Sequence, residues 1–479
     1  MALWFPLVPY INQAPPSDIR SFAPTLLGGL VYALLVIGLF ALLILSFHRA
    51  ERSDGGSPRP LYFILAGSLL LALPLLFTYP INATDIFRYV IRGRIASVYG
   101  QNPFVVPAAS FTSDPFILLT GEWANETSPY GPVWELVAAG LTAISGDSLL
   151  VGVLLFKSLA LACFSIMTAL IWSLLPKNHS RVAYTLLWAW NPALFLIFVV
   201  DGHNDAMMLL WLMLGYWLAR RGRVVSGFLV MSLAALTKPI AILALPFFFL
   251  EFFRHMAASR RRLALAALLG VPILTWLAFL PWAGSHGPLR TSIELALRLV
   301  REATGGAAFS PPVWFFMALD KSVPIQVFGR IAQGLLALAV LWLLWRAIRD
   351  RSALRGTADV FYTYIITALN FRIWYAAWPF PWLLLDTTNE SPDLADRAAY
   401  RLRAGFWFLL TSQLSVIIYG HLRTYLFGGD HRVAHLVGVP FVFVLPFFLA
   451  RLPSPFSLSA GSQKSDTLTQ TYSEGELNS

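Results

Sequence analysis

Long apolar stretches dominate this chain and leave it few ways to fold. A helix needs about 20 mostly apolar residues to cross the hydrocarbon core of a bilayer. Because that core offers no hydrogen-bond partner to unpaired backbone groups, segments that cross it are helices or closed barrels. Nine stretches are expected to cross completely. They are residues 24–47, 61–79, 147–175, 182–200, 206–220, 262–282, 324–346, 404–420 and 433–451. The sequence therefore predicts an all-α, polytopic transmembrane helical bundle.

Two further apolar regions have arginines at both ends, which indicates segments that enter the membrane and return to the same side. In the region 224–253 the turn is expected at Lys238, directly before a proline. In the region 358–388 it is expected at Arg372. Each region counts as two short helices, so the bundle is predicted to have about 13 membrane segments.

The distribution of charge predicts how the bundle is oriented. Only 13% of the 479 residues are charged, and the net charge is +10. In a soluble protein such an excess would suggest nucleic acid, but here the arginines gather in short loops, as is typical of cytoplasmic loops. We expect no nucleic-acid partner, an outside N-terminus and an inside C-terminus. The membrane domain is predicted at 1–453, with external loops at about 80–146 and 283–323, before a disordered cytoplasmic tail at 454–479.

The first external loop begins with a candidate catalytic group. Thr84 is a plausible N-cap, which places Asp85 in the first turn of a helix, where the positive helix end favours the ionised carboxylate. Arg88 and Arg92 follow at i+3 and i+7, on the same helical face. The arrangement suits a base beside a phosphate-binding site. The alternative is an interfacial ion pair with arginines that contact lipid headgroups.

A second polar cluster lies between two apolar spans, with no space for a polar loop. It contains Asp201, His203, Asn204 and Asp205. Ionisable residues at membrane depth are costly and usually indicate a functional site. These side chains could bind sugar hydroxyls or an acceptor, hold a metal or relay protons. The alternative is a tight turn in which Asp205 caps the following helix.

The turns of the two re-entrant regions are the third candidate. Non-helical backbone at membrane depth is tolerated only where it lines a polar cavity or is buried in protein, and both Lys238 and Arg372 are good partners for phosphate. The alternative for each is a side chain that extends towards the interface. Trp374 and Tyr375 could stack on a sugar, line a lipid groove or anchor the protein at the interface.

Six groups of residues spread over roughly residues 60–390 follow one another in a recognisable order. They are Asp85-Ile86-Phe87-Arg88-Tyr89 with Arg92-Gly93-Arg94; Gln101-Asn102-Pro103-Phe104; Ser128-Pro129-Tyr130-Gly131-Pro132; Asn191-Pro192 with Gly202-His203-Asn204-Asp205; Leu236-Thr237-Lys238-Pro239; and Trp374-Tyr375 with Trp378-Pro379. In this order they resemble the glycosyltransferase-C (GT-C) superfamily, especially bacterial polyprenyl-phosphate-mannose-dependent mannosyltransferases.

The resemblance implies a membrane glycosyltransferase of the bacterial plasma membrane, with its active site facing outside. It implies a polyprenyl-phosphate sugar as donor, with mannose as the expected sugar, and a lipid or glycan of the cell envelope as acceptor. Asp85 matches the position of the base, and Tyr130 is expected to contact the sugar or the acceptor. The chain departs from many relatives in having Tyr130-Gly131-Pro132 instead of Tyr-Pro-Pro. It also has a single carboxylate where some relatives have an acidic pair, so we expect no metal and no cofactor.

The chemistry expected from these residues is one inverting displacement. Lys238 and Arg372, helped by Arg88 or Arg92, would hold the departing phosphate, while Asp85 accepts the proton of the attacking hydroxyl. A transporter or flippase of lipid-linked sugar is the alternative from another class, because broken helices with charges at the membrane midplane also occur there. The concentration of charge on one side favours the transferase.

Overall fold

The structure is a computed structural model, and it confirms the all-α prediction. The residues that it describes are 2–12, 18–53, 55–178, 180–255, 261–283, 287–302, 309–319, 324–349, 351–387 and 392–452. Within these ranges the regular secondary structure is helical, and the only β-type pairing is one isolated bridge between Pro6 and Thr78. The predicted tail at 454–479 and part of the predicted loop at 283–323 lie outside the described residues.

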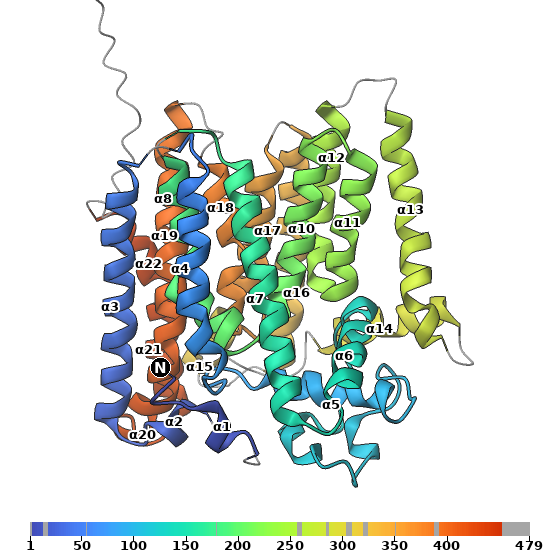
Figure 1. The fold of residues 1–479 in the computed structure, drawn as a ribbon, viewed down its shortest axis with the longest axis vertical. Helices are drawn as coiled ribbons and strands as arrows, with labels where there is room; N and C mark the ends of the chain where they lie inside the picture. The colour runs from blue at the N-terminus through green and yellow to red at the C-terminus, as the bar shows by residue number, and fades with distance from the viewer. Residues whose placement is uncertain are drawn as a thin grey trace, which may run out of the picture.

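Within the described residues, eight helical segments are long and apolar enough to cross a membrane. They are Leu26–Ala50 (α3), Arg59–Leu76 (α4), Leu149–Leu174 (α7), Ser180–Val200 (α8, α9 and η3), Arg261–Trp282 (α13 and η6), Ile325–Ile348 (α16), Asp396–Tyr425 (most of α19, with η8 and α20) and His431–Leu449 (α21 and α22). Each corresponds to one predicted span. The ninth predicted span forms α10 (Asp205–Arg220), which is shorter, at 16 residues, but stands among the others in the bundle (Figure 1).

Both re-entrant regions are broken where the sequence predicts. The first contains α11 (Val224–Thr237) and α12 (Leu245–His255), separated by Lys238 and a short 3₁₀ helix, η4 (Pro239–Leu243). Lys238 is extended, with φ −140° and ψ 111°, because the ring of a following proline disfavours the helical conformation. The second region has the same plan.

In the second region, α17 (Ala353–Thr367) and α18 (Phe380–Asp386) are separated by a 3₁₀ helix, η7 (Ile373–Ala377). Arg372 precedes η7 in an extended conformation. Each broken region therefore places one cation on irregular backbone between two helices.

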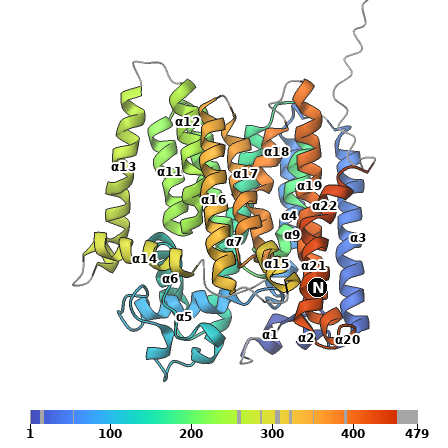
Figure 2. The same cartoon turned by 180° about the vertical axis from the view of Figure 1, so that it is seen from behind.

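The short helices of the first predicted external loop gather at one end of the bundle. α5 (Asp85–Ser97) and α6 (Pro132–Ser145) lie there, together with α2 (Ile19–Phe22) and α14 (Pro288–Glu302) (Figures 1 and 2). The connections from α3 to α4 and from α10 to α11 lie at the opposite end (Figure 1). This alternation matches the predicted order of sides along the chain.

The loop that carries α5 is fixed by close packing and by a buried cation. Gly93 of α5 faces α6 so closely that a Cβ there would lie 2.4 Å from the carbonyl oxygen of Ala138. Arg94 is 2% exposed, and its guanidinium bonds the buried carboxylate of Asp114 at 2.9 Å and the carbonyl of Gly146 at 2.9 Å. These contacts join α5 to the segment around Asp114 and to the end of α6, so Arg94 is a structural residue that holds the loop together.

The lipid-facing side of the bundle is apolar, as a membrane environment requires. Large side chains on the outer helices are strongly exposed, for example Leu34, Leu70, Leu269 and Leu338, each between 66% and 72%. In water, exposed apolar surface of this extent would be unfavourable, since each Å² costs about 25 cal/mol. Acyl chains cover such a surface without that cost.

The contact between α5 and α6 gives a test of the packing. Gly93→Ala is expected to lower the melting temperature, because the new methyl group meets backbone that cannot move aside, and overpacking costs about 1–3 kcal/mol. The matched control is Gly140→Ala on α6, where a Cβ meets nothing within 4 Å and helix propensity favours alanine by up to about 1 kcal/mol. The measurement is thermal unfolding in detergent, followed by tryptophan fluorescence. Equal melting temperatures for the two variants would contradict the packing.

Candidate functional site

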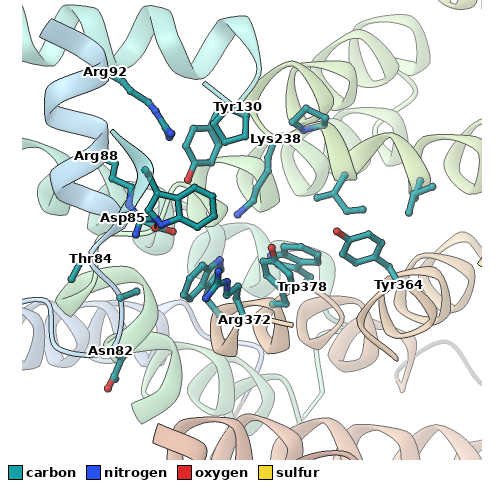
Figure 3. Close-up of a pocket in the computed structure, with 18 of the residues that line it drawn as sticks. Asn82, Thr84, Asp85, Arg88, Arg92, Tyr130, Lys238, Tyr364, Arg372 and Trp378 are labelled. Atoms are coloured by element: carbon teal, nitrogen blue, oxygen red, sulfur yellow. Dashed lines mark hydrogen bonds and ion pairs between the residues drawn. The ribbon is translucent and has the colours of Figure 1, made fainter. Parts of the chain in front are cut away.

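A cavity of about 800 Å³ lies where α5, η4 and η7 meet. It is lined by eight of the residues that the sequence singled out, which come from three distant parts of the chain. They are Asp85, Arg88, Arg92, Tyr130, Lys238, Arg372, Trp374 and Tyr375. Figure 3 shows Arg88 and Arg92 on α5, with Lys238 and Arg372 facing them from the other walls. The tertiary structure therefore brings the first loop and both re-entrant turns to one site.

The carboxylate of Asp85 is buried but remains close to cations. α5 begins at Asp85, with Thr84 in the N-cap position, although the Thr84 side chain makes no capping hydrogen bond. Arg88 Nη1 lies 2.6 Å from Asp85 Oδ1. Burial raises the pKa of Asp85, but the charges of Arg88, and also of Lys238 and Arg372, outweigh it and hold the pKa below its ordinary value. Asp85 is therefore ionised at neutral pH and can accept a proton.

Lys238 is held in the cavity wall by a buried carboxylate. Its Nζ lies 2.8 Å from both oxygens of Asp205, and Asp205 also accepts a hydrogen bond from the indole of Trp378. Three aromatic rings surround the ammonium, with ring centres at 5.4 Å for Trp378, 5.6 Å for Tyr375 and 6.0 Å for Tyr130. An ammonium has three N–H donors, so this geometry fixes Lys238 and leaves it able to bond a ligand.

The predicted cluster at 201–205 lies behind the cavity wall. Asp201, His203, Asn204 and Asp205 are at most 2% exposed, and none of them lines the cavity. The predicted alternative, a cap formed by Asp205, is also not what the structure has. The N-cap position of α10 is Asn204, without a side-chain cap bond, and the Asp205 carboxylate bonds Lys238. The four residues are thus placed to support the site.

His203 lies between the two carboxylates. Its ring stacks on Trp374 at a centroid distance of 4.1 Å, and its Nδ1 is 3.8 Å from Asp85 Oδ2 and 3.8 Å from Asp205 Oδ2. Neither ring nitrogen has a hydrogen-bond partner within the described chain. His203 therefore fixes Trp374 in the cavity wall and faces Asp85 from behind.

The segment that leads into Asp85 is held by two membrane-embedded side chains. Lys157 of α7 is fully buried and donates a hydrogen bond to the carbonyl of Thr78, so it is a paired structural residue. Asp201 accepts a hydrogen bond of 3.3 Å from the backbone N–H of Asn82. The side chain of Asn82 in turn donates to Gln413 at 3.3 Å. Both ends of the segment 78–82 are thus tied to the bundle.

Several cavity residues were missed by the sequence analysis. Trp123 packs on the guanidinium of Arg88, with Arg88 Cζ 4.9 Å from the ring centre. It ends a short 3₁₀ helix, η2 (Ile117–Trp123), for which the sequence gave no signal. Asp18 reaches the cavity because the N–H of Ile19 bonds the carbonyl of Ile81 at 3.2 Å. Trp378 did carry a signal, since it belongs to a motif that the sequence analysis noted.

One wall of the cavity is mostly apolar. It is formed by η4 and α16 and consists of Pro239, Ile240, Ile242, Leu243 and Leu336, with one polar side chain, Gln333. Ile242 is 60% exposed, so this wall continues to the outer surface of the bundle. The cavity therefore combines a cationic end with an apolar side. In the described part of the chain, no group of three or more His, Cys, Asp or Glu side chains is arranged to hold a metal.

Comparison with known proteins identifies a matching family. A family model described as the N-terminal domain of alpha-(1->6)-mannopyranosyltransferase matches residues 12–254, just over half of the chain. The matched region includes Asp85, Tyr130, Asp205 and Lys238 and ends before Arg372. No solved structure matches the chain.

Curated relatives carry the same description. Alpha-(1->6)-mannopyranosyltransferase A of Mycobacterium tuberculosis is 26% identical over 340 residues, which cover 66% of this chain and 63% of that protein. Alpha-(1->6)-mannopyranosyltransferase A of Corynebacterium glutamicum is 26% identical over 205 residues, or 42% of this chain and 41% of that protein. The chain therefore spans less than two thirds of the length of these relatives.

The buried pair of Asp205 and Lys238 can be tested by a double-mutant cycle. Asp205→Asn and Lys238→Met should each lower the melting temperature, because each leaves one charge without its partner, at a cost of about 3–5 kcal/mol. The double variant, which has neither charge, should melt at a higher temperature than either single variant. Thermal unfolding in detergent measures this order. A double variant whose loss equals the sum of the two single losses would show that the pair does not position Lys238.

Proposed function

The chain belongs to the alpha-(1->6)-mannopyranosyltransferase family, and from this premise we propose that it transfers mannose from a polyprenyl-phosphate donor to a lipid or glycan acceptor. One observation carries the proposal. An ionised carboxylate, Asp85, shares a cavity with four cationic side chains and an apolar wall. A base, a phosphate site and a lipid path are the three parts that this reaction needs.

The cationic end of the cavity suits the phosphate of the donor. Lys238 and Arg372 stand on irregular backbone at the two breaks, and Arg88 and Arg92 face them from α5 (Figure 3). Fixed cations stabilise a departing phosphate without reorganising, which makes them more effective than water. Because the phosphate leaves without needing a proton, the reaction requires no general acid.

The apolar wall suits the polyprenyl chain of the donor. Ile240, Ile242 and Leu243 follow Lys238 directly, so an apolar surface begins next to the proposed phosphate site. It faces Leu336 of α16 and reaches the outer surface of the bundle through the exposed Ile242. A donor could therefore keep its chain in the bilayer while its phosphate enters the cavity.

The reaction is one displacement at the anomeric carbon. Asp85 accepts the proton of the acceptor hydroxyl while the hydroxyl oxygen forms a bond to that carbon. The bond from the same carbon to the phosphate oxygen breaks, and its electron pair leaves with the polyprenyl phosphate, held by Lys238 and Arg372. One displacement inverts the anomeric centre, so an α-linked product requires a β-linked donor. We propose that this displacement needs no metal ion.

The remaining polar residues would orient these groups. Trp374, Tyr375 and Tyr130 line the cavity and would contact the sugar or the acceptor. Asp205 would hold Lys238, and His203 would hold Trp374. The site lies at the end of the bundle that carries α5 and α6, the side that the charge distribution predicts to face outside the bacterial plasma membrane.

The first test compares the wild type with Asp85→Asn on a panel of radiolabelled polyprenyl-phosphate sugars. The wild type is expected to move mannose to an acceptor and to release polyprenyl phosphate. The rate of transfer by the variant should be lower by about 10²–10⁴-fold, the typical contribution of a general base. Its melting temperature should stay near that of the wild type. Near-normal transfer by the variant would exclude Asp85 as the base.

The pH dependence of kcat/KM gives an independent test of the base. Because the pKa of Asp85 is below its ordinary value, the carboxylate stays ionised as the pH falls. As the pH is lowered, kcat/KM of the wild type should therefore not begin to fall until the pH is below the ordinary pKa range of an aspartate.

Arg88→Gln is the matched variant for the pH profile. It removes the charge that acts most strongly in lowering the pKa of Asp85, so the acidic limb should move to higher pH. Initial rates of mannose transfer across the pH range measure both profiles. An acidic limb at the same pH in both proteins would contradict the assignment of that limb to Asp85.

A further inference from the structure

A second cavity, of about 450 Å³, lies beside the mouth of the first. Its walls come from two segments far apart in the chain, the segment around α2 and the segment formed by η8 (Ile418–Leu422) and α20 (Arg423–Tyr425). α2 and α20 lie side by side at the same end of the bundle as α5 (Figures 1 and 2). Asp18 lines both cavities, so they are adjacent.

The walls of this second cavity are fixed by hydrogen bonds between the two chain segments. The ring Nε2 of His421 donates to the carbonyl of Ala23 at 2.7 Å, and the hydroxyl of Tyr425 donates to the carbonyl of Pro24. His421 is fully buried. A cavity whose walls are tied together in this way is preformed, so a ligand binds there without paying to order a loop.

The charges in the second cavity favour a neutral ligand with many hydroxyl groups. The guanidinium of Arg20 forms a fork on one oxygen of the Asp18 carboxylate, with Nη2 at 2.6 Å and Nε at 3.0 Å from Oδ2, while Oδ1 accepts the backbone N–H of Arg20 at 2.9 Å. About half of each side chain is accessible, at 46% and 43%. The fork therefore presents an acceptor next to a donor, with no net charge. Because the two charges are paired, neither an anion nor a cation gains a net attraction, whereas hydroxyl groups can bond both members of the pair.

A sugar ring matches this arrangement. Adjacent hydroxyl groups on a pyranose each donate and accept, so one hydroxyl can bond the carboxylate while its neighbour bonds the guanidinium. The hydroxyl of Ser21 adds a group that can donate and accept. The hydroxyl of Thr424, which donates to the carbonyl of Gly420 at 2.9 Å, adds an acceptor, and Tyr425 contributes an aromatic ring to the wall. A few convergent polar groups on a rigid wall are typical of sites for small polar ligands.

The position of Asp18 relates the second cavity to the base. The backbone N–H of Ile19 bonds the carbonyl of Ile81, four residues before Asp85. An acceptor whose terminal hydroxyl faces Asp85, and which leaves the first cavity on this side, would pass Asp18.

We propose that the second cavity is an acceptor subsite, which binds a neutral sugar unit one or more positions behind the sugar that receives mannose. This inference builds on the proposed function. It implies that the acceptor is an oligosaccharide or a glycan, recognised through more than its terminal residue.

The test compares two synthetic acceptors in the presence of a saturating polyprenyl-phosphate mannose donor. One is an alkyl α-mannoside with a single sugar, and the other is the corresponding α-1,6-linked trisaccharide. Arg20→Gln should raise the KM for the trisaccharide about tenfold, which corresponds to about 1.4 kcal/mol, because it removes a hydrogen bond from a charged donor. The KM for the single sugar and both kcat values should stay within about twofold of the wild type, as expected for loss of binding that does not change between ground and transition states.

Two further variants separate binding from folding. Ser21→Ala removes one hydroxyl and leaves the fork intact, so it should raise the KM for the trisaccharide by a smaller factor and keep the melting temperature. Arg290→Gln is the matched control, because it breaks an exposed ion pair with Glu294, 2.8 Å long, at the same end of the protein. It should change neither KM.

The outcomes distinguish the subsite from the function on which it builds. If wild-type protein uses both acceptors but Arg20→Gln and Ser21→Ala leave the KM for the trisaccharide unchanged, the subsite is wrong and the proposed function stands. The same holds if Arg20→Gln raises both KM values equally. If wild-type protein transfers mannose to neither acceptor, the proposed function fails, and the subsite with it.

Discussion

Backbone groups inside a bilayer have no water to bond, so a helix that ends there must end against other polar groups. In both re-entrant regions the first helix ends in this way, before Lys238 in one and before Arg372 in the other. Their irregular backbone is acceptable because it borders the main cavity, and the same irregularity brings a cation to the cavity wall. The constraint that limits the fold thus also produces the site.

Charge balance is the second condition on this site. Asp205 is buried and would be costly alone, but it bonds both Lys238 and Trp378. Asp85 is likewise balanced by Arg88 at 2.6 Å. The cavity keeps further cations beyond these pairs, so a donor phosphate would complete the balance. A pocket of this kind is preorganised for an anion and needs little rearrangement to hold one.

Several features could be predicted because they depend on local sequence. Apolar length predicted the spans, and flanking arginines predicted the two re-entrant regions, whose breaks lie at Lys238-Pro239 and Arg372. The helix that begins at Asp85 was predicted from its capping position. The role of Asp205 was not, because its partners lie 33 and 173 residues away along the chain. For the same reason the sequence expected Asp201 and His203 to contact a sugar, whereas they lie behind the wall.

The sequence by itself therefore determined that the chain is a helical membrane bundle, where its helices break, and which ionisable residues are too costly to be accidental. These conclusions follow from hydrophobic length and from the cost of burying charge, which act residue by residue. Only the tertiary structure decided which of those residues face the cavity and which support it. It also brought Asp18 to the cavity that contains Asp85, by pairing Ile19 with Ile81. Such contacts join residues far apart in the chain, and no local pattern records them.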